Sequence, residues 1–276
     1  MSDSGHPGYP HGRAPRPPIR VTLSTASVYP ELLGAGFEIA AATGYDGVEV
    51  MVTADPLTQR AEILQELSSR HRMPIDSIHA PCLLISARVW GVDPLVKLSR
   101  SIELAERVGA RVVVVHPPFV WQRAAATDFT GAVAELQERT DVRIAVENMF
   151  PLSVGRGRFK VNSYRPHWNP VPYGHRWFTL DLSHTATARI DAIELFEAMG
   201  DRLGHLHLAD GSGSGTDEHL VPGRGNQPGA QVLETLARNG YDGSVCLEIN
   251  TRGLSKKARL DDVRQSLTFA RLALGQ

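Results

Sequence analysis

The 276-residue chain is predicted to fold as a single (β/α)8 barrel. From residue 19 onward, short apolar runs of strand length alternate with stretches of helical character. Parallel strands need crossover helices between them, so this alternation favours a parallel sheet. Eight such units in about 255 residues favour a closed barrel over an open sheet. No Gly-x-Gly-x-x-Gly motif follows the first predicted strand, which disfavours a dinucleotide-binding fold.

The predicted strands are rich in Val, Ile and Leu and end at polar or turn residues. They span residues 19–27, 47–52, 75–80, 111–116, 142–148, 177–182, 203–208 and 243–249. Helices are predicted over residues 30–43, 55–72, 93–108, 128–139, 191–199, 229–239 and 261–274. Gly44, Gly109 and Gly240 follow three of these helices and are typical helix stops.

One long segment between the fifth and sixth strands, residues 149–175, shows little periodicity and is predicted to be a loop. It interleaves basic and aromatic side chains. Such a loop at a barrel mouth is open to three interpretations: a lid over a sugar phosphate, a nucleic-acid contact, or a solvated loop or subunit contact.

Composition restricts the class of protein. The formal net charge is −1, so bulk charge gives no indication of a polyanionic partner. The two cysteines, Cys82 and Cys246, are too few for a disulfide framework, which favours a reducing cytoplasm. No apolar run reaches the roughly 18 residues of a membrane span. Residues 1–18 are rich in Pro, Gly, His and Arg and are predicted to be a disordered tail before a barrel of residues 19–276.

Ionisable side chains gather at the carboxyl-terminal ends of the predicted strands. Glu147, Asp181 and Glu248 lie at the ends of the fifth, sixth and eighth strands, and His207 lies near the end of the seventh. In a parallel barrel these ends share one face, which carries the active site in barrel enzymes. Buried polar groups without partners cost free energy, so we expect these strand ends to converge on a divalent cation.

Side-chain alternation along each strand predicts which residues face the barrel interior. Each acid at a strand end is preceded by an apolar residue that is expected to face the surrounding helices. These apolar residues are Val146, Leu180 and Leu247.

Further polar residues are expected at the same face. His79 and His116 end the third and fourth strands, and we expect them in the pocket, either as metal ligands or in another role. Asp217 and His219 lie in a Gly-rich loop, where a functional role and loop-stabilising hydrogen bonds are equal alternatives. Hydrogen-bonded structural roles are expected for Glu49 and His205.

The motifs at the strand ends resemble those of a known group of barrels. From residue 19 onward the chain is similar to the xylose isomerase-like TIM barrel superfamily. This superfamily holds the sugar phosphate isomerase/epimerase group and, as a sister branch, the endonuclease IV-type AP endonucleases (AP endonuclease family 2). The motifs that carry the resemblance are GYDGVEV, IHAP, VVVHPP, AVEN, LDLSHT, HLHLAD, DEHLVPGRG and CLEIN, in this order along the chain.

The isomerase/epimerase branch implies one divalent ion, Zn²⁺, Mn²⁺, Mg²⁺ or Co²⁺, and four ligands: Glu147, Asp181, His207 and Glu248. Glu147 and Glu248 would then act as the catalytic acid/base pair that moves a proton through an enediolate. The substrate would be a small sugar, sugar phosphate or polyol-derived ketone, and the enzyme could be a homo-oligomer. Substrate-binding roles are implied for His79, His116, His184, His219 and Arg224.

The endonuclease branch implies up to three zinc ions and cleavage of a phosphodiester. All nine ligand positions of that branch are matched: His79, His116, Glu147, Asp181, His184, His207, Asp217, His219 and Glu248. The chain departs from this branch at its first strand end, where STASVYP replaces a His-containing, Gly-rich segment. A zinc-dependent AP endonuclease or phosphodiesterase, acting on nucleic acid, is therefore the second hypothesis. A metabolite-binding barrel without turnover is the third.

Overall fold

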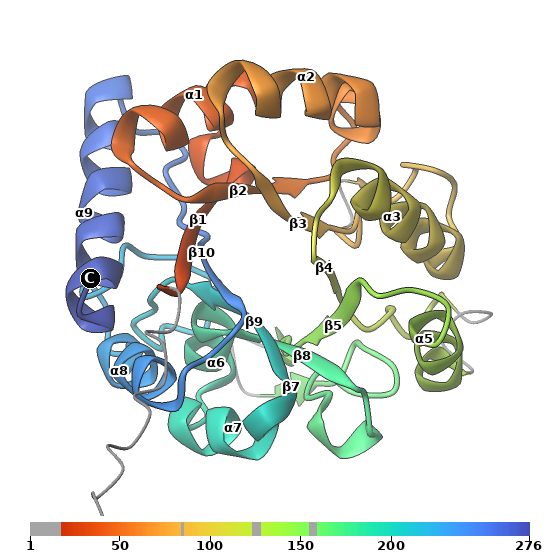
Figure 1. The fold of residues 1–276 in the computed structure, drawn as a ribbon. Coiled ribbons are helices and arrows are strands. Elements are labelled where there is room, and N and C mark those ends of the chain that lie inside the picture. Colours follow the sequence, from red (N-terminus) through yellow and green to blue (C-terminus); the bar gives the residue numbers. More distant parts are fainter. Residues whose placement is uncertain (1–17, 84–85, 123–127, 155–158) are drawn as a thin grey trace, which may run out of the picture.

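The computed structural model describes residues 18–83, 86–122, 128–154 and 159–276. Eight of its strands form the barrel: β1 Arg20–Ser24, β2 Gly47–Met51, β3 Ile75–His79, β4 Val112–Val115, β5 Arg143–Glu147, β8 Trp177–Asp181, β9 Leu203–Leu208 and β10 Ser244–Leu247. All neighbouring strands pair in parallel, and the sheet closes in the order β1-β10-β9-β8-β5-β4-β3-β2 (Figure 1). The predicted (β/α)8 barrel is therefore confirmed.

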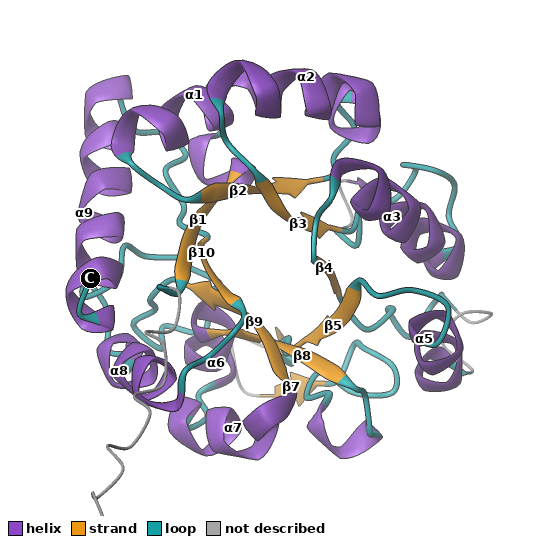
Figure 2. Ribbon diagram, viewed as in Figure 1, coloured by secondary structure: helices purple, strands orange, loops and turns teal. Residues whose placement is uncertain are grey.

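Helices surround this barrel on its outside (Figure 2). They are α1 Leu33–Thr43, α2 Ala61–His71, α3 Pro94–Val108, α5 Phe129–Gln137, α6 Leu182–Ala188, α7 Ala192–Met199, α8 Gly229–Asn239 and α9 Lys256–Leu274. The three predicted glycine stops follow α1, α3 and α8, each in the left-handed conformation. None of the helices among the described residues combines the length and the apolar character needed to cross a membrane.

Two predicted boundaries were wrong because a short 3-10 turn replaces regular structure. The first strand was expected to reach residue 27, but the chain turns into the 3-10 helix Thr25–Val28. The Ser24 side chain caps this turn by accepting a hydrogen bond from the Ala26 N–H. The helix expected over residues 55–72 is divided into the 3-10 helix Pro56–Gln59 and α2.

Two elements were absent from the sequence prediction. Helix α6 follows β8 without a loop, and all seven of its residues, polar ones included, are buried. Its polar and apolar residues therefore do not separate into an exposed and a buried face, and no helical pattern results. The segment 149–175 is not a featureless loop, because it contains a short antiparallel hairpin, β6 Leu152–Val154 with β7 Phe159–Val161, and the 3-10 helix Val171–Tyr173. Residues 1–17 of the tail expected over residues 1–18, and residues 155–158 of the long segment, lie outside the described residues.

The predicted alternation of side chains is confirmed. Val146, Leu180 and Leu247 belong to the main apolar core, which lies between the sheet and the helices. Ala145 belongs instead to a separate small cluster with Val112 and Val114. Alternation along the strands therefore separates the outer core from the barrel interior, and it directs each acid at a strand end inward.

Charged side chains cluster at the amino-terminal ends of the strands. Asp76, 1% exposed, forms ion pairs with Arg20 and Arg111. Arg143 pairs with Asp242 at 2.7 Å. Its guanidinium also stacks over the Trp177 ring, 4.5 Å from the ring centroid. The charged groups at this end of the barrel therefore pair with one another, in structural ion pairs. Candidate functional residues lie at the opposite, carboxyl-terminal ends of the strands.

His175 lies in an apolar setting between α5 and β8. It is 3% exposed, and neither ring nitrogen has a hydrogen-bond partner. Its ring contacts Phe129 and Phe178 edge-on, at centroid distances of 5.8 and 6.3 Å. Burial, reinforced by the charge of Arg202, lowers the pKa of His175 to about 4. The folded protein therefore keeps this imidazole neutral.

The free energy of unfolding should therefore fall as the pH drops from about 6.5 toward about 4. In that window the unfolded chain binds a proton at His175 that the folded protein does not, at a total cost of about 3 kcal/mol once the pH is below about 4. The variant His175→Phe keeps the ring contacts and should lose this part of the slope. Urea unfolding of both proteins across the window is the measurement, and parallel curves would contradict the assignment.

Candidate metal centre

Four strands that are neighbours in the barrel deliver the central side chains. Glu147 ends β5, Asp181 ends β8, His207 lies on β9, and Glu248 follows β10 directly. All four are buried. The Nδ1 atom of His207 lies 3.3 Å from Glu147 Oε1, 3.5 Å from Asp181 Oδ2 and 2.9 Å from Glu248 Oε2. The four residues that the sequence analysis placed together do meet.

Asp181 is held in place by its backbone surroundings. It is the N-cap of α6, and its Oδ1 accepts the His184 N–H at 2.7 Å. The Asn148 side chain accepts the Asp181 N–H at 2.8 Å and donates to the Asp181 carbonyl at 3.0 Å. Asn148 was given no role on the basis of the sequence, although this residue ends the AVEN motif. These contacts leave Asp181 Oδ2 pointing to the central cluster.

Two buried carboxylate oxygens support a bound cation. Within the described part of the chain, Asp181 Oδ2 and Glu147 Oε2 accept no hydrogen bond of acceptable geometry. A buried oxygen without a donor costs about 1–3 kcal/mol. Glu147, Asp181 and His207 each offer one ligand atom, and these three atoms lie within 4.8 Å of one another. Carboxylate oxygens together with an imidazole nitrogen suit a divalent transition ion or Mg²⁺.

Two further histidines approach Glu147 from β3 and from the end of β4. The Nε2 atom of His116 lies 3.0 Å from Glu147 Oε2, and that of His79 lies 3.5 Å from the same oxygen. These two nitrogens are 3.3 Å apart. The three side chains form a second group whose ligand atoms lie within 4.8 Å. Glu147 thus belongs to both groups.

A third group lies above Asp181 at the rim of the barrel. The Nε2 atoms of His184 and His219 lie 3.4 and 3.2 Å from Asp217 Oδ2. The Ser183 hydroxyl donates to Asp217 Oδ1 at 2.9 Å and accepts the His219 N–H at 2.9 Å. Ser183 was not assigned a role from the sequence, yet it attaches this loop to α6. All nine expected positions therefore lie in one continuous cluster.

The charges in this cluster shift the pKa values of its members. Burial raises the pKa of Glu147, but nearby His116 and His207 outweigh burial and hold it well below its usual range. Burial lowers the pKa of His79, yet the neighbouring carboxylate of Glu147, together with the charges of Glu248 and Glu49, raises it to about 9. The acids beside His219 likewise raise its pKa to about 10 against the effect of burial. The cluster is therefore a strong attractor of positive charge.

Glu49 and His205 occupy the layer below this cluster, in line with the structural roles expected of them. Glu49 Oε2 accepts a hydrogen bond from the Ser77 hydroxyl at 2.8 Å and lies 3.0 Å from His205 Nε2. It also lies 3.3 Å from the Nε2 atom of His207. Glu49 therefore contacts a member of the central cluster from beneath.

Arg224 was expected to contact substrate, but the structure places its side chain against α9. Its guanidinium hydrogen-bonds to Asp262 and Gln265, at 2.5 and 2.6 Å. This arrangement gives no support to a substrate-binding role. Asp210, beyond β9, accepts the backbone N–H groups of Gly223 and Gln227 and so shapes the loop that carries His219.

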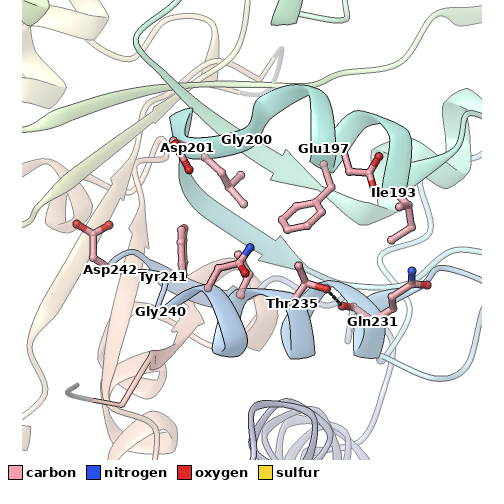
Figure 3. A pocket seen from close by; sticks show the side chains of 13 residues that line it. Ile193, Glu197, Gly200, Asp201, Gln231, Thr235, Gly240, Tyr241 and Asp242 are labelled. Carbon is pink, nitrogen blue, oxygen red and sulfur yellow. Dashed lines mark hydrogen bonds between the residues drawn. The ribbon is translucent and has the colours of Figure 1, made fainter. Parts of the chain in front are cut away.

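A groove with a volume of about 520 Å³ lies away from the cluster, between α7 and α8. Phe196 and Leu236 contribute apolar walls. Glu197 and Asp201 add acids to the lining (Figure 3). It borders the start of β9, which is the opposite end of the barrel from Asp181 and Glu248. Size alone does not identify the functional site, because the groove lacks the convergent ligand atoms of the cluster.

Comparisons with known proteins agree with this architecture. The model of the family described as xylose isomerase-like TIM barrel matches residues 37–272. The uncharacterized protein Rv0498 of Mycobacterium tuberculosis is 47% identical over 277 residues, covering 94% of this chain and 99% of that protein. Fructoselysine 3-epimerase of Shigella flexneri is 20% identical over 236 residues, covering 78% of this chain and 84% of that enzyme.

Solved structures of low sequence identity share the fold. A D-tagatose 3-epimerase-like protein superposes with a TM-score of 0.66 at 22% identity, covering 92% of this chain and 99% of that chain. An AP endonuclease, family 2, from Brucella melitensis superposes with a TM-score of 0.61 at 18% identity, covering 87% and 96%. The family match over most of the chain, together with the closed barrel, shows that this chain belongs to the xylose isomerase-like TIM barrel family.

Proposed function

We propose that this protein is a divalent-metal-dependent isomerase or epimerase of a small sugar, sugar phosphate or polyol-derived ketone. One observation carries the proposal: three buried carboxylates, from Glu147, Asp181 and Glu248, surround the Nδ1 atom of His207. Sugar epimerases among the family's relatives and structural neighbours support the substrate class. Membership in an enzyme-rich family supports turnover over binding alone.

The proposed ligands of the ion are Glu147, Asp181, His207 and Glu248. When bound there, a divalent ion would supply Lewis-acid stabilisation to a substrate oxygen that gains negative charge. Asp181 and His207 lie on the two middle strands of the four, with the two glutamates on the outer strands. The glutamates are therefore placed on either side of the centre.

This placement suits a two-base mechanism. One glutamate takes the proton from the carbon beside the carbonyl, and the other returns a proton from the opposite side. His79, His116, His184 and His219 surround the same space and are proposed to hold substrate hydroxyls. Arg224 is omitted because its guanidinium pairs with Asp262. The enediolate would form beside these buried side chains.

Substitution tests the roles of the two glutamates. Glu147→Gln and Glu248→Gln should each lower the rate of epimerisation by about 10²- to 10⁴-fold, measured at saturating Mn²⁺. Each variant keeps one base, so in D₂O each should still exchange the carbon-bound proton of only one of the two epimers. The exposed Glu197→Gln is the control and should behave as the wild type. Near-normal rates in both variants would rule out the two-base mechanism.

A second function is favoured by a specific observation. The His79–His116–Glu147 group and the His184–Asp217–His219 group match, position by position, the additional ligands implied by the endonuclease branch. A zinc-dependent AP endonuclease or phosphodiesterase with up to three ions is therefore the alternative. In that case the partner of the protein is nucleic acid, and the clustered charge would clamp a phosphodiester.

Metal content separates the two functions. Elemental analysis of protein purified without chelator should show one divalent ion per chain, and neither His116→Asn nor Asp217→Asn should change that count. This follows because neither substituted residue is one of the four proposed ligands. Two or three tightly held zinc ions, each lost with the substitution in its own group, would instead favour the endonuclease. Cleavage of an abasic duplex would then be the decisive assay.

A further inference from the structure

Glu49 is the acid inside the barrel that the proposed mechanism does not use. It lies in the middle of β2 with no exposed surface, one layer below the central cluster. Among the described residues, no Arg or Lys side chain forms an ion pair with the Glu49 carboxylate. Its neighbours are the Ser77 hydroxyl and the imidazoles of His205 and His207. A buried carboxylate needs donors of this kind because isolated charges are costly inside a protein.

The hydrogen bonds to Glu49 determine which ring nitrogens of His205 and His207 carry hydrogen. An ionised carboxylate can only accept hydrogen bonds, so the nitrogens that face Glu49 must carry hydrogen. Those nitrogens are the Nε2 atoms of His205 and His207, which lie 3.0 and 3.3 Å from Glu49 Oε2. The second nitrogen of His205, Nδ1, lies 3.1 Å from the Ser244 hydroxyl, which can donate to it. His205 is thereby satisfied on both sides.

The second nitrogen of His207 faces a different environment. In a neutral imidazole with hydrogen on Nε2, the Nδ1 atom carries a lone pair. That atom lies 2.9 to 3.5 Å from oxygens of Glu147, Asp181 and Glu248, which as carboxylates have no hydrogen to donate. The lone pair is therefore directed at the position where these acids converge. A proton on Nδ1 satisfies the imidazole and these acids in the metal-free protein, and a divalent ion bound at the same position would replace that proton.

We propose that Glu49 is a positioning residue that keeps the Nε2 of His207 protonated and so presents Nδ1 as a metal ligand. The inference rests on the proposed metal-dependent function and deepens it. Outer carboxylates of this kind commonly set the tautomer and ring orientation of a ligating histidine. Glu49 acts from across the barrel, since β2 and β9 are not neighbours in the sheet. His205 shares the same carboxylate and so keeps Glu49 from rotating away.

The variant Glu49→Gln tests this role. A glutamine has nearly the same shape, but its amide group can donate to Nε2 and thereby favour hydrogen on Nδ1 of His207, where it blocks the ligand. We expect the affinity for Zn²⁺ or Co²⁺, measured by titration into metal-free protein, to fall about 10- to 100-fold. Ser77→Ala is the matched control, because it removes a donor to Glu49 and leaves the carboxylate facing both histidines. Its affinity should stay close to that of the wild type.

The ¹⁵N NMR spectrum of labelled histidine provides a readout that does not depend on activity. In zinc-loaded wild type, and in metal-free wild type at alkaline pH, His207 should carry hydrogen on Nε2. In Glu49→Gln the Nδ1–H form should increase. Hydrogen on Nδ1 in the wild type would overturn the proposal even if the variant fails to fold. Unchanged tautomer and affinity in a folded Glu49→Gln would overturn it as well.

The same experiment separates this inference from the proposed function. A wild type that binds no divalent ion would refute the metal-dependent enzyme, while the alkaline spectra of the metal-free proteins would still decide whether Glu49 sets the tautomer. A wild type that binds the ion, with a variant of equal affinity, would refute the role of Glu49 alone.

Discussion

The convergence of buried carboxylates on one imidazole is the constraint on which the carboxyl-terminal half of the barrel depends. Glu147, Asp181 and Glu248 repel one another in a medium of low dielectric constant, so the fold must compensate their charge. Histidines supply part of that compensation. Glu49, together with Glu248 and Glu147, raises the pKa of His207 against the effect of burial. Asp181 and Asp217 raise the pKa of His184 in the same way. A divalent ion would supply more. The repulsion within the cluster destabilises the folded protein, and a metal-binding function is the best explanation for its presence.

The interior beneath the cluster is built to hold it still. Hydroxyls from Ser77 and Ser244 contact the Glu49–His205 pair, so Glu49 Oε2 and both ring nitrogens of His205 have partners within the barrel. Closure of the sheet fixes the distances between strands that are far apart in the sequence. Asn148 and Ser183 add hydrogen bonds at the top, where strands give way to loops. Ligand groups therefore rest on rigid elements, which suits a centre that must hold a precise geometry.

Glu147 belongs both to the ligand group of the proposed isomerase and to the second ligand group that the endonuclease would need. It contacts His207 on one side and His116 on the other. Such a carboxylate can act as a base beside one ion or bridge two ions. Glu147 is therefore the position at which the proposed one-ion isomerase and the alternative multi-ion endonuclease would differ.

The sequence by itself determined the fold class and the residues of the central site. Apolar strands, helix stops and acids at strand ends are local patterns, and the parallel barrel converts them into one face. Only the tertiary structure decided the partner of Arg224, the helix α6 and the contact between Glu49 and His207. Arg224 pairs with Asp262, 38 residues away, and Glu49 meets a residue 158 positions away. Such contacts depend on chain closure in space, and α6 is buried on all sides, so no local periodicity could reveal them.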